Sequence, residues 1–181
     1  MNPFISLLFF LLLIQASSTS AQPDIVVDTC KKCAESSPNV NYTLCIDSFN
    51  SIPESHNSTL QDLSIIATNI TEANATSIVS ELETILRDTP STDSAYMRSC
   101  LETCLELYSD SVSSLDDSVE AIRAKRYGDA DIMLSSVVDA PRTCEDGFSD
   151  GEIESPLKVE NDEFFGHSVI ALGIVAMLQK T

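Results

Sequence analysis

The scarcity of helix-breaking residues is the feature of this chain that most constrains its fold. The 181 residues include only 5 Gly and 7 Pro, and residues 58–86 and 94–127 contain neither type. A multi-stranded sheet needs frequent turns built on Gly and Pro, so these two stretches favour helices. Within each stretch apolar residues recur at steps of three and four positions, which is the period of an amphipathic helix. Two long helices are therefore predicted.

Two further helices are predicted nearer the C-terminus. One covers residues 130–144, with Ile132 among its apolar positions, and Pro141 is expected to kink or interrupt it. The other covers residues 162–179, whose mostly apolar sequence predicts a buried bundle helix rather than the tail of a lipid-anchor signal. Residues 145–163 contain eight acids and one Lys, and we expect them to form an exposed loop.

The ends of these helices carry recognisable signals. Gly128 is expected to follow the C-terminus of the second helix, and Asp129 to cap the third. Ser58 and Gln61 have the spacing of a capping box at the start of the first helix.

Two short helices are predicted ahead of the four longer ones. They cover residues 24–37 and 43–51 and would form a small hairpin. Such short helices need cross-linking or docking to stay ordered. Four longer helices with short connections predict an all-α fold, an antiparallel four-helix bundle with an N-terminal helical hairpin.

The N-terminal residues 1–21 have the pattern of a secretory signal peptide. They contain no charged side chain, residues 5–14 are almost wholly Leu, Ile and Phe, and small residues precede a cleavage point expected after Ala21. A transmembrane anchor is the alternative, but the apolar run is too short to cross a bilayer. The predicted mature domain is therefore 22–181, with the hairpin in residues 22–56 and the bundle in residues 57–181.

Four Asn-x-Ser/Thr sequons follow the predicted cleavage point. They are candidate glycosylation sites at Asn41, Asn57, Asn69 and Asn74. Together with the signal peptide they predict a secreted, extracellular glycoprotein, in a compartment where disulfides form.

The charge balance excludes two classes of partner. Acidic residues number 28 against 10 basic ones, which gives a formal net charge of -18. Nucleic-acid binding needs a basic face that neutralises phosphates, and docking on anionic membranes needs polybasic segments. We therefore expect neither a nucleic-acid partner nor a membrane anchor.

The six cysteines are expected to be structural. A Cys30-x-x-Cys33 pair is typical of thioredoxin-like redox sites, but no βαβ pattern surrounds it. Zinc binding is disfavoured because the two histidines, His56 and His167, are isolated. Disulfides are the better interpretation, and the spacing alone leaves their pairing open.

Motifs of catalysis are absent from the sequence. There is no G-x-S-x-G, no H-E-x-x-H and no Gly-rich phosphate loop. The acidic alternation at residues 150–154 lacks the glycine and the closing Glu of a calcium-binding EF-hand loop. The sequence therefore predicts a non-enzymatic protein without a cofactor or a metal ion.

Four segments in register resemble a known family. Residues 29–33, 37–45, 104–108 and 143–148 are similar to landmarks of the plant invertase and pectin methylesterase inhibitors, and the resemblance spans nearly the whole mature chain. Within that family, the sequence most resembles invertase inhibitors that include a plane-tree pollen allergen.

The resemblance implies a fold and a disulfide pattern. Family members are four-helix bundles with an N-terminal helical hairpin, which agrees with the helix prediction. The family's two disulfides would fall on Cys30–Cys45 and Cys104–Cys144. Cys33 and Cys100 lie outside those positions and are expected either to form a third bridge or to remain free thiols.

The resemblance also implies a function. Members inhibit a cell-wall enzyme, pectin methylesterase or invertase, by plugging its active-site cleft. Invertase inhibitors of the tobacco type carry a Pro-Lys-Phe motif where this chain has residues 127–129, Tyr-Gly-Asp, and the missing motif argues against invertase as the target. Pectin methylesterase inhibitors dock through faces of bundle helices. A secreted helical carrier of lipid or a small apolar ligand is the alternative, because six Cys and several helices fit that class too.

Overall fold

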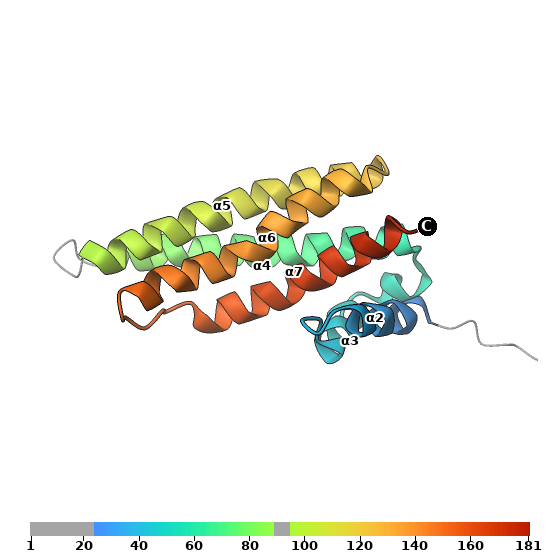
Figure 1. Cartoon of the computed structure of the whole chain (residues 1–181), viewed down its shortest axis with the longest axis horizontal. Coiled ribbons are helices and arrows are strands. Elements are labelled where there is room, and N and C mark those ends of the chain that lie inside the picture. Colours follow the sequence, from blue (N-terminus) through green and yellow to red (C-terminus); the bar gives the residue numbers. More distant parts are fainter. Residues whose placement is uncertain (1–23, 89–94) are drawn as a thin grey trace, which may run out of the picture.

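The computed structural model describes residues 24–88 and 95–181. The predicted signal peptide, residues 1–21, lies outside the described residues. Four long helices form an antiparallel bundle in which each helix packs against two neighbours (Figure 1). They are α4 (Leu60–Asp88), α5 (Ala95–Arg123), α6 (Tyr127–Asp150) and α7 (Lys158–Leu178). Within the described ranges all regular secondary structure is helical, so the all-α fold is confirmed.

A helical hairpin lies at one end of the bundle, beside α4 and α7 (Figure 1). It consists of α2 (Ile25–Ser36), α3 (Tyr42–Asn50) and a short 3₁₀ helix, η1 (Pro53–Asn57), which the sequence did not predict. The Asp24 side chain caps α2 by accepting a bond from the Val26 amide at 2.9 Å. Asn41 caps α3 in the same way through the Leu44 amide, at 3.1 Å. Asx side chains at this position satisfy amides that the first helical turn leaves unpaired.

The bundle core contains large apolar and aromatic side chains. Tyr108 of α5 and Phe164 of α7 pack edge to face, with ring centroids 5.0 Å apart and both side chains fully buried. Edge-to-face contact suits the quadrupoles of aromatic rings and adds to the stabilisation from burial. The two rings therefore hold α5 and α7 together across the core.

The start of α4 differs by one residue from the predicted cap. The capping box is formed by Thr59 and Asp62: the Thr59 amide donates to the Asp62 carboxylate at 3.0 Å, and the Asp62 amide to the Thr59 hydroxyl at 3.1 Å. Ser58 and Gln61 are therefore not the box. The Gln61 side chain instead donates to the carbonyl of Ile122 at 3.0 Å.

The connection between α5 and α6 also differs from the prediction, because Gly128 is not the terminating residue. Lys125 takes the left-handed conformation, with φ 58°, and the Arg126 amide bonds to the carbonyl of Ala121 at 2.8 Å. This bond is the 6→1 interaction of a Schellman helix end, which usually uses Gly. Gly128 and Asp129 lie within the first turn of α6.

The third bundle helix is longer than predicted, and Pro141 does not interrupt it. Helix α6 continues to Asp150, so residues 145–150 are helical and the loop before α7 is confined to residues 151–157. Pro141, Cys144 and Phe148 are all buried. Their packing on the core supplies the stabilisation that offsets the hydrogen bond lost at Pro141.

Two disulfides cross-link the fold, one in each part. Cys30–Cys45 joins α2 to α3, and Cys104–Cys144 joins α5 to α6; the resemblance implied these two pairs. Cys33 and Cys100 are free thiols. Cys33 is in α2, at the hairpin end, and Cys100 is near the start of α5 at the opposite end, so no third bridge joins them (Figure 1).

The described residues contain neither a membrane-spanning helix nor a metal-binding cluster. Across residues 24–88 and 95–181, no helix is long and apolar enough to span a membrane. Within the same ranges, no group of three or more His, Cys, Asp or Glu side chains is arranged to hold a metal ion.

Candidate docking surface

Small polar side chains leave a groove between α5 and α6. This groove measures about 400 Å³ and opens to solvent. A second cavity, of about 480 Å³, lies at the hairpin and is described below. Leu107 and Ala140 contribute apolar surface to the groove, and Asp110 adds a carboxylate. The remaining lining consists of serines, namely Ser111, Ser113, Ser114 and Ser136. Short side chains here expose the helix surfaces to a partner.

The charged side chains of α5 and α6 are all acidic over long spans of both helices. Between Leu101 and Ile122, α5 carries acidic residues and no Lys or Arg. The same holds for α6 between Tyr127 and Pro141. The acids are Glu102, Glu106, Asp110, Asp116, Asp117 and Glu120 on α5, and Asp129, Asp131 and Asp139 on α6. A surface of one sign attracts a partner of the opposite sign and speeds their encounter.

One aliphatic side chain projects from this acidic surface. Ile132 of α6 is 72% exposed and lies one helical turn before Ser136, which lines the groove. The sequence pattern predicts Ile132 among the apolar positions of this helix, but the structure shows that it is not part of the core. The register of Leu134, Val137 and Cys144, which are buried, is the signal that excludes it. An exposed aliphatic side chain next to a groove can act as an anchor when a partner offers a pocket for it.

The groove is held by a covalent and a polar connection. Cys104–Cys144 ties α5 to α6 directly. The buried Tyr108 hydroxyl donates to the side-chain oxygen of Asn161 on α7, whose amide nitrogen donates to Glu145 on α6. Burial raises the pKa of Tyr108, and Glu145 and Glu160 raise it further, so the hydroxyl remains a donor. These contacts fix the three helices relative to one another.

The turn that joins the end of α5 to the start of α6 carries positive charge. Arg123, Lys125 and Arg126 are exposed there, and Arg126 pairs with Asp129 at 2.5 Å. Residues 127–129, which align with the Pro-Lys-Phe motif, belong to α6 rather than to a projecting loop. The Tyr127 carbonyl accepts a bond from the Gln179 side chain at 3.2 Å.

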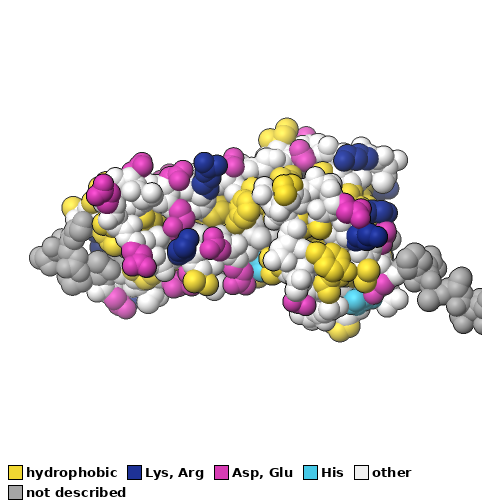
Figure 2. All heavy atoms as spheres, turned by 60° about the horizontal axis from the view of Figure 1, so that its bottom comes forward, with side chains coloured by type: hydrophobic (Ala, Val, Ile, Leu, Met, Phe, Trp, Pro, Cys, Tyr) yellow, Lys and Arg dark blue, Asp and Glu magenta, His cyan; other side chains and the backbone are white. Residues whose placement is uncertain are grey.

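The second groove lies where the hairpin meets the bundle. Its volume is about 480 Å³, and its floor is apolar, with Leu172 and Met177 of α7 and Val138 of α6. Lys32 and Lys180 stand among its lining residues, which include no acid. Figure 2 shows a group of basic side chains at this end of the molecule, whereas acidic side chains are scattered along the bundle.

Comparison with known proteins identifies the family. Residues 24–174 match the plant invertase/pectin methylesterase inhibitor family. The chain belongs to this family. It is similar to a "Putative invertase inhibitor" of Platanus acerifolia, with 36% identity over 171 residues that cover 94% of this chain and 93% of the relative. It is also similar to "Pectinesterase inhibitor 12" of Arabidopsis thaliana, at 29% identity over 98% of this chain and 100% of that protein.

A further relative and a solved structure agree with this assignment. The "Pectinesterase inhibitor" of Actinidia deliciosa is 29% identical over 80% of this chain and 76% of its own length. The crystal structure of a mutant form of a pectin methylesterase inhibitor from Arabidopsis has a TM-score of 0.67 at 21% identity. That match covers 82% of this chain and 93% of the solved chain, and it shows that the family's helical fold is shared.

The four sequons of this family member all lie in the hairpin and in α4. Asn41, Asn57 and Asn69 are exposed. Asn74 is half-buried, and its side-chain oxygen is buried without a hydrogen-bond partner among the described residues. Neither α5 nor α6 contains a sequon.

Proposed function

We propose that this chain is a secreted protein inhibitor that binds a cell-wall pectin methylesterase (pectinesterase) and blocks its active-site cleft. Membership of the inhibitor family and the names of its relatives support the inhibitor class. The observation that carries the mode of binding is the acidic, serine-lined groove between α5 and α6, with Ile132 beside it. A disulfide-tied surface loses little conformational entropy on binding, which favours a tight complex.

One observation favours the α5–α6 surface over the hairpin and α4, while its acidic side chains complement a basic enzyme surface. The four sequons lie in the hairpin and α4, so glycans attached there would leave the groove uncovered. The surface is therefore available whether or not the sequons are glycosylated.

Pectin methylesterase is the better target for two reasons. The tobacco-type Pro-Lys-Phe motif is replaced by Tyr127-Gly128-Asp129, and these residues are folded into the first turn of α6. Asp129 also holds Arg126 in an ion pair, which reduces the positive charge that this turn offers to a partner. Invertase is retained as the second target, because the Platanus relatives are named as its inhibitors.

The test is a titration of the oxidised protein against a pectin methylesterase and a cell-wall invertase. We expect stoichiometric loss of pectin methylesterase activity, and slower association as salt is added, because salt screens the acidic surface. Inhibition of invertase alone would reverse the assignment of the target. Inhibition of neither enzyme would exclude the inhibitor function.

Secretion is part of the same proposal. We expect residues 1–21 to be removed, so that the exported domain starts at Gln22, with its hairpin in residues 22–56 and its bundle in residues 57–181. Export of the full chain from plant cells, followed by N-terminal sequencing, tests the cleavage point. Retention of the intact chain inside the cells would contradict secretion.

A further inference from the structure

Cys100 lies next to the disulfide that joins α5 to α6. It precedes Cys104 by one helical turn on α5, so the two side chains are on the same face of the helix. Its sulfur is 3.4 Å from the carbonyl oxygen of Gly147, which follows Cys144 by about one turn on α6. A free thiol therefore lies beside both partners of the Cys104–Cys144 bridge.

The thiol and the bridge share one cavity that opens to solvent. The cavity measures about 170 Å³, and its lining includes Cys100 from α5 and Cys144 from α6. Gly147 leaves room between them: a β-carbon at this position would meet only the Cys100 sulfur, at 3.8 Å. Tyr96 also lines the cavity, and its hydroxyl donates a hydrogen bond to the Gly147 carbonyl at 2.9 Å.

We propose that Cys100, Cys104 and Cys144 form a thiol–disulfide exchange site, in which Cys100 replaces Cys104 as the partner of Cys144. The Cys100 thiol loses its proton, and the resulting thiolate attacks the sulfur of Cys144. A Cys100–Cys144 bond forms as the Cys104–Cys144 bond breaks. The electron pair leaves on the Cys104 sulfur, which takes up a proton, so the step needs no external oxidant or reductant.

Cys144 is the sulfur attacked because helix geometry excludes the alternative. Residues four apart on a helix have β-carbons about 6 Å apart, whereas a disulfide needs about 3.8 Å. A Cys100–Cys104 bridge would therefore unwind α5. Cys144 lies on the neighbouring helix and lines the same cavity as Cys100, so a bridge between those two would join α5 to α6 and would not require two positions of α5 to be bonded to each other.

The other free thiol is an internal control. Cys33 also lies one turn from a disulfide cysteine, Cys30. Both free thiols are buried, but Cys33 is 0% exposed whereas Cys100 is 7% exposed and lines the solvent-open cavity. The Cys33 sulfur is 3.6 Å from the sulfur of Met177, and a β-carbon at Gly173 would be 3.3 Å from it. Burial raises the pKa of Cys33 to about 11, which disfavours the thiolate that exchange requires. We therefore expect exchange at Cys100 and none at Cys33.

The experiment follows the free thiols of the folded, oxidised protein over time. One sample is quenched in acid at once, and another is first held for hours at about pH 8.5, where thiolates form more readily. Both are then unfolded in acid, labelled with a maleimide and mapped by mass spectrometry. The first sample should carry label on Cys33 and Cys100. In the second, label on Cys104 should rise as label on Cys100 falls, with the total per chain unchanged.

Two variants make the result specific. In Cys100→Ala, Cys104 should stay unlabelled. In Cys33→Ala, label should move from Cys100 to Cys104 as it does in the parent protein. Circular dichroism confirms that both variants are folded, and a rate independent of protein concentration shows that exchange is intramolecular. Label that never leaves Cys100, label appearing on Cys144 instead of Cys104, or equal labelling of Cys104 in Cys100→Ala would overturn the proposal.

Discussion

The hydroxyl of Tyr108 on α5 donates a hydrogen bond to the side-chain oxygen of Asn161 on α7. Both side chains are buried, at 0% and 2% exposure, so water cannot replace either partner. Asn161 also donates to Glu145 on α6. Its amide therefore joins three helices behind the α5–α6 groove.

Removal of the Tyr108 hydroxyl should destabilise the bundle. In Tyr108→Phe the ring still packs on Phe164, but the oxygen of Asn161 is left buried without its donor. The expected cost is about 1–3 kcal/mol in the free energy of unfolding, measured by urea denaturation. Tyr42→Phe is the matched control, because Tyr42 is 43% exposed, and it should change stability little. Equal effects of the two substitutions would refute this role for the hydroxyl.

Substitution by Ala should change the stability in opposite directions at two glycines, one within α6 and one that caps its C-terminus. Nothing lies within 4 Å of a β-carbon at Gly128, so Gly128→Ala should stabilise the helix by up to about 1 kcal/mol. A β-carbon at Gly151 would lie 2.1 Å from the Tyr96 ring. Gly151→Ala must therefore displace the Tyr96 ring, which breaks the hydrogen bond from the Tyr96 hydroxyl to the Gly147 carbonyl. The expected cost is about 1 kcal/mol in the free energy of unfolding. Thermal melts of the two variants measure both changes, and the same sign for both would be inconsistent with the structure.

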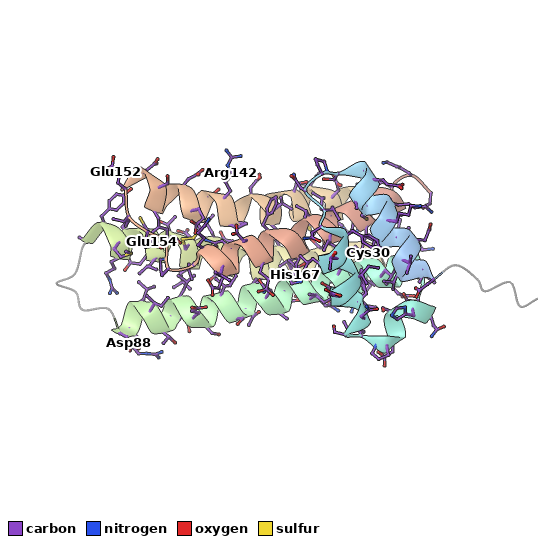
Figure 3. The ribbon with its side chains drawn as sticks, turned by 90° about the horizontal axis from the view of Figure 1, so that it is seen from below. Cys30, Asp88, Arg142, Glu152, Glu154 and His167 are labelled. Atoms are coloured by element: carbon purple, nitrogen blue, oxygen red, sulfur yellow. A yellow bond between two sulfur atoms is a disulfide. The ribbon has the colours of Figure 1, made fainter. Side chains whose placement is uncertain are left out.

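His167 should make the fold less stable in acid. It lies where α7 faces α3 and α4, near Phe49 and Ile70, and its Nδ1 is buried without a hydrogen-bond partner among the described residues (Figure 3). Burial lowers the pKa of His167, and Glu163 only partly opposes this effect. The unfolded chain therefore binds the proton at higher pH than the folded chain, so stability falls as pH drops below about 6.5.

His167→Gln isolates this effect because it removes the titrating group. The free energy of unfolding of the parent should fall more than that of the variant between neutral pH and about pH 5, the range just below the ordinary pKa of His. Urea titrations at the two pH values measure the difference. A parallel loss in both proteins would show that His167 does not contribute.

Ile132 should anchor the complex with the target enzyme. Ile132→Ala removes an exposed aliphatic side chain beside the groove and should weaken inhibition about tenfold or more, as expected for an interface anchor. Val159→Ala is the matched control, since Val159 is 71% exposed but lies on α7. Inhibition constants for the two variants decide the matter: a loss confined to Val159→Ala would move the docking surface away from α5 and α6.

The architecture was predictable because α4 and α5 combine apolar periodicity with a lack of Gly and Pro. The length of α6 was not, because Pro141 and the acids after Cys144 signal a helix end locally. Phe148, buried on the core, provides tertiary packing that overrides those signals. The turn at Lys125 was missed for a related reason, since a Lys in the left-handed conformation leaves no compositional signal.

The candidate surface was only partly predictable. Net charge anticipates an acidic exterior, but it does not show that α5 and α6 leave a groove between them. The exposure of Ile132 depends on the register of the buried residues around it, since Ala130 and Leu134, two positions away on either side, are the ones that face the core. The position of Cys100 beside Cys144 requires the alignment of two helices, which the sequence spacing leaves open.

Each disulfide closes within its own part of the molecule, and neither joins the hairpin to the bundle. The hairpin has further ties of its own, including the 2.7 Å contact between His56 and Asp24. Apart from the backbone that runs from η1 into α4, its attachment to α4 and α7 is therefore non-covalent. The hairpin and the bundle are thus expected to open as separate cooperative units, with the hairpin amides exchanging their hydrogens while α5 and α6 remain protected.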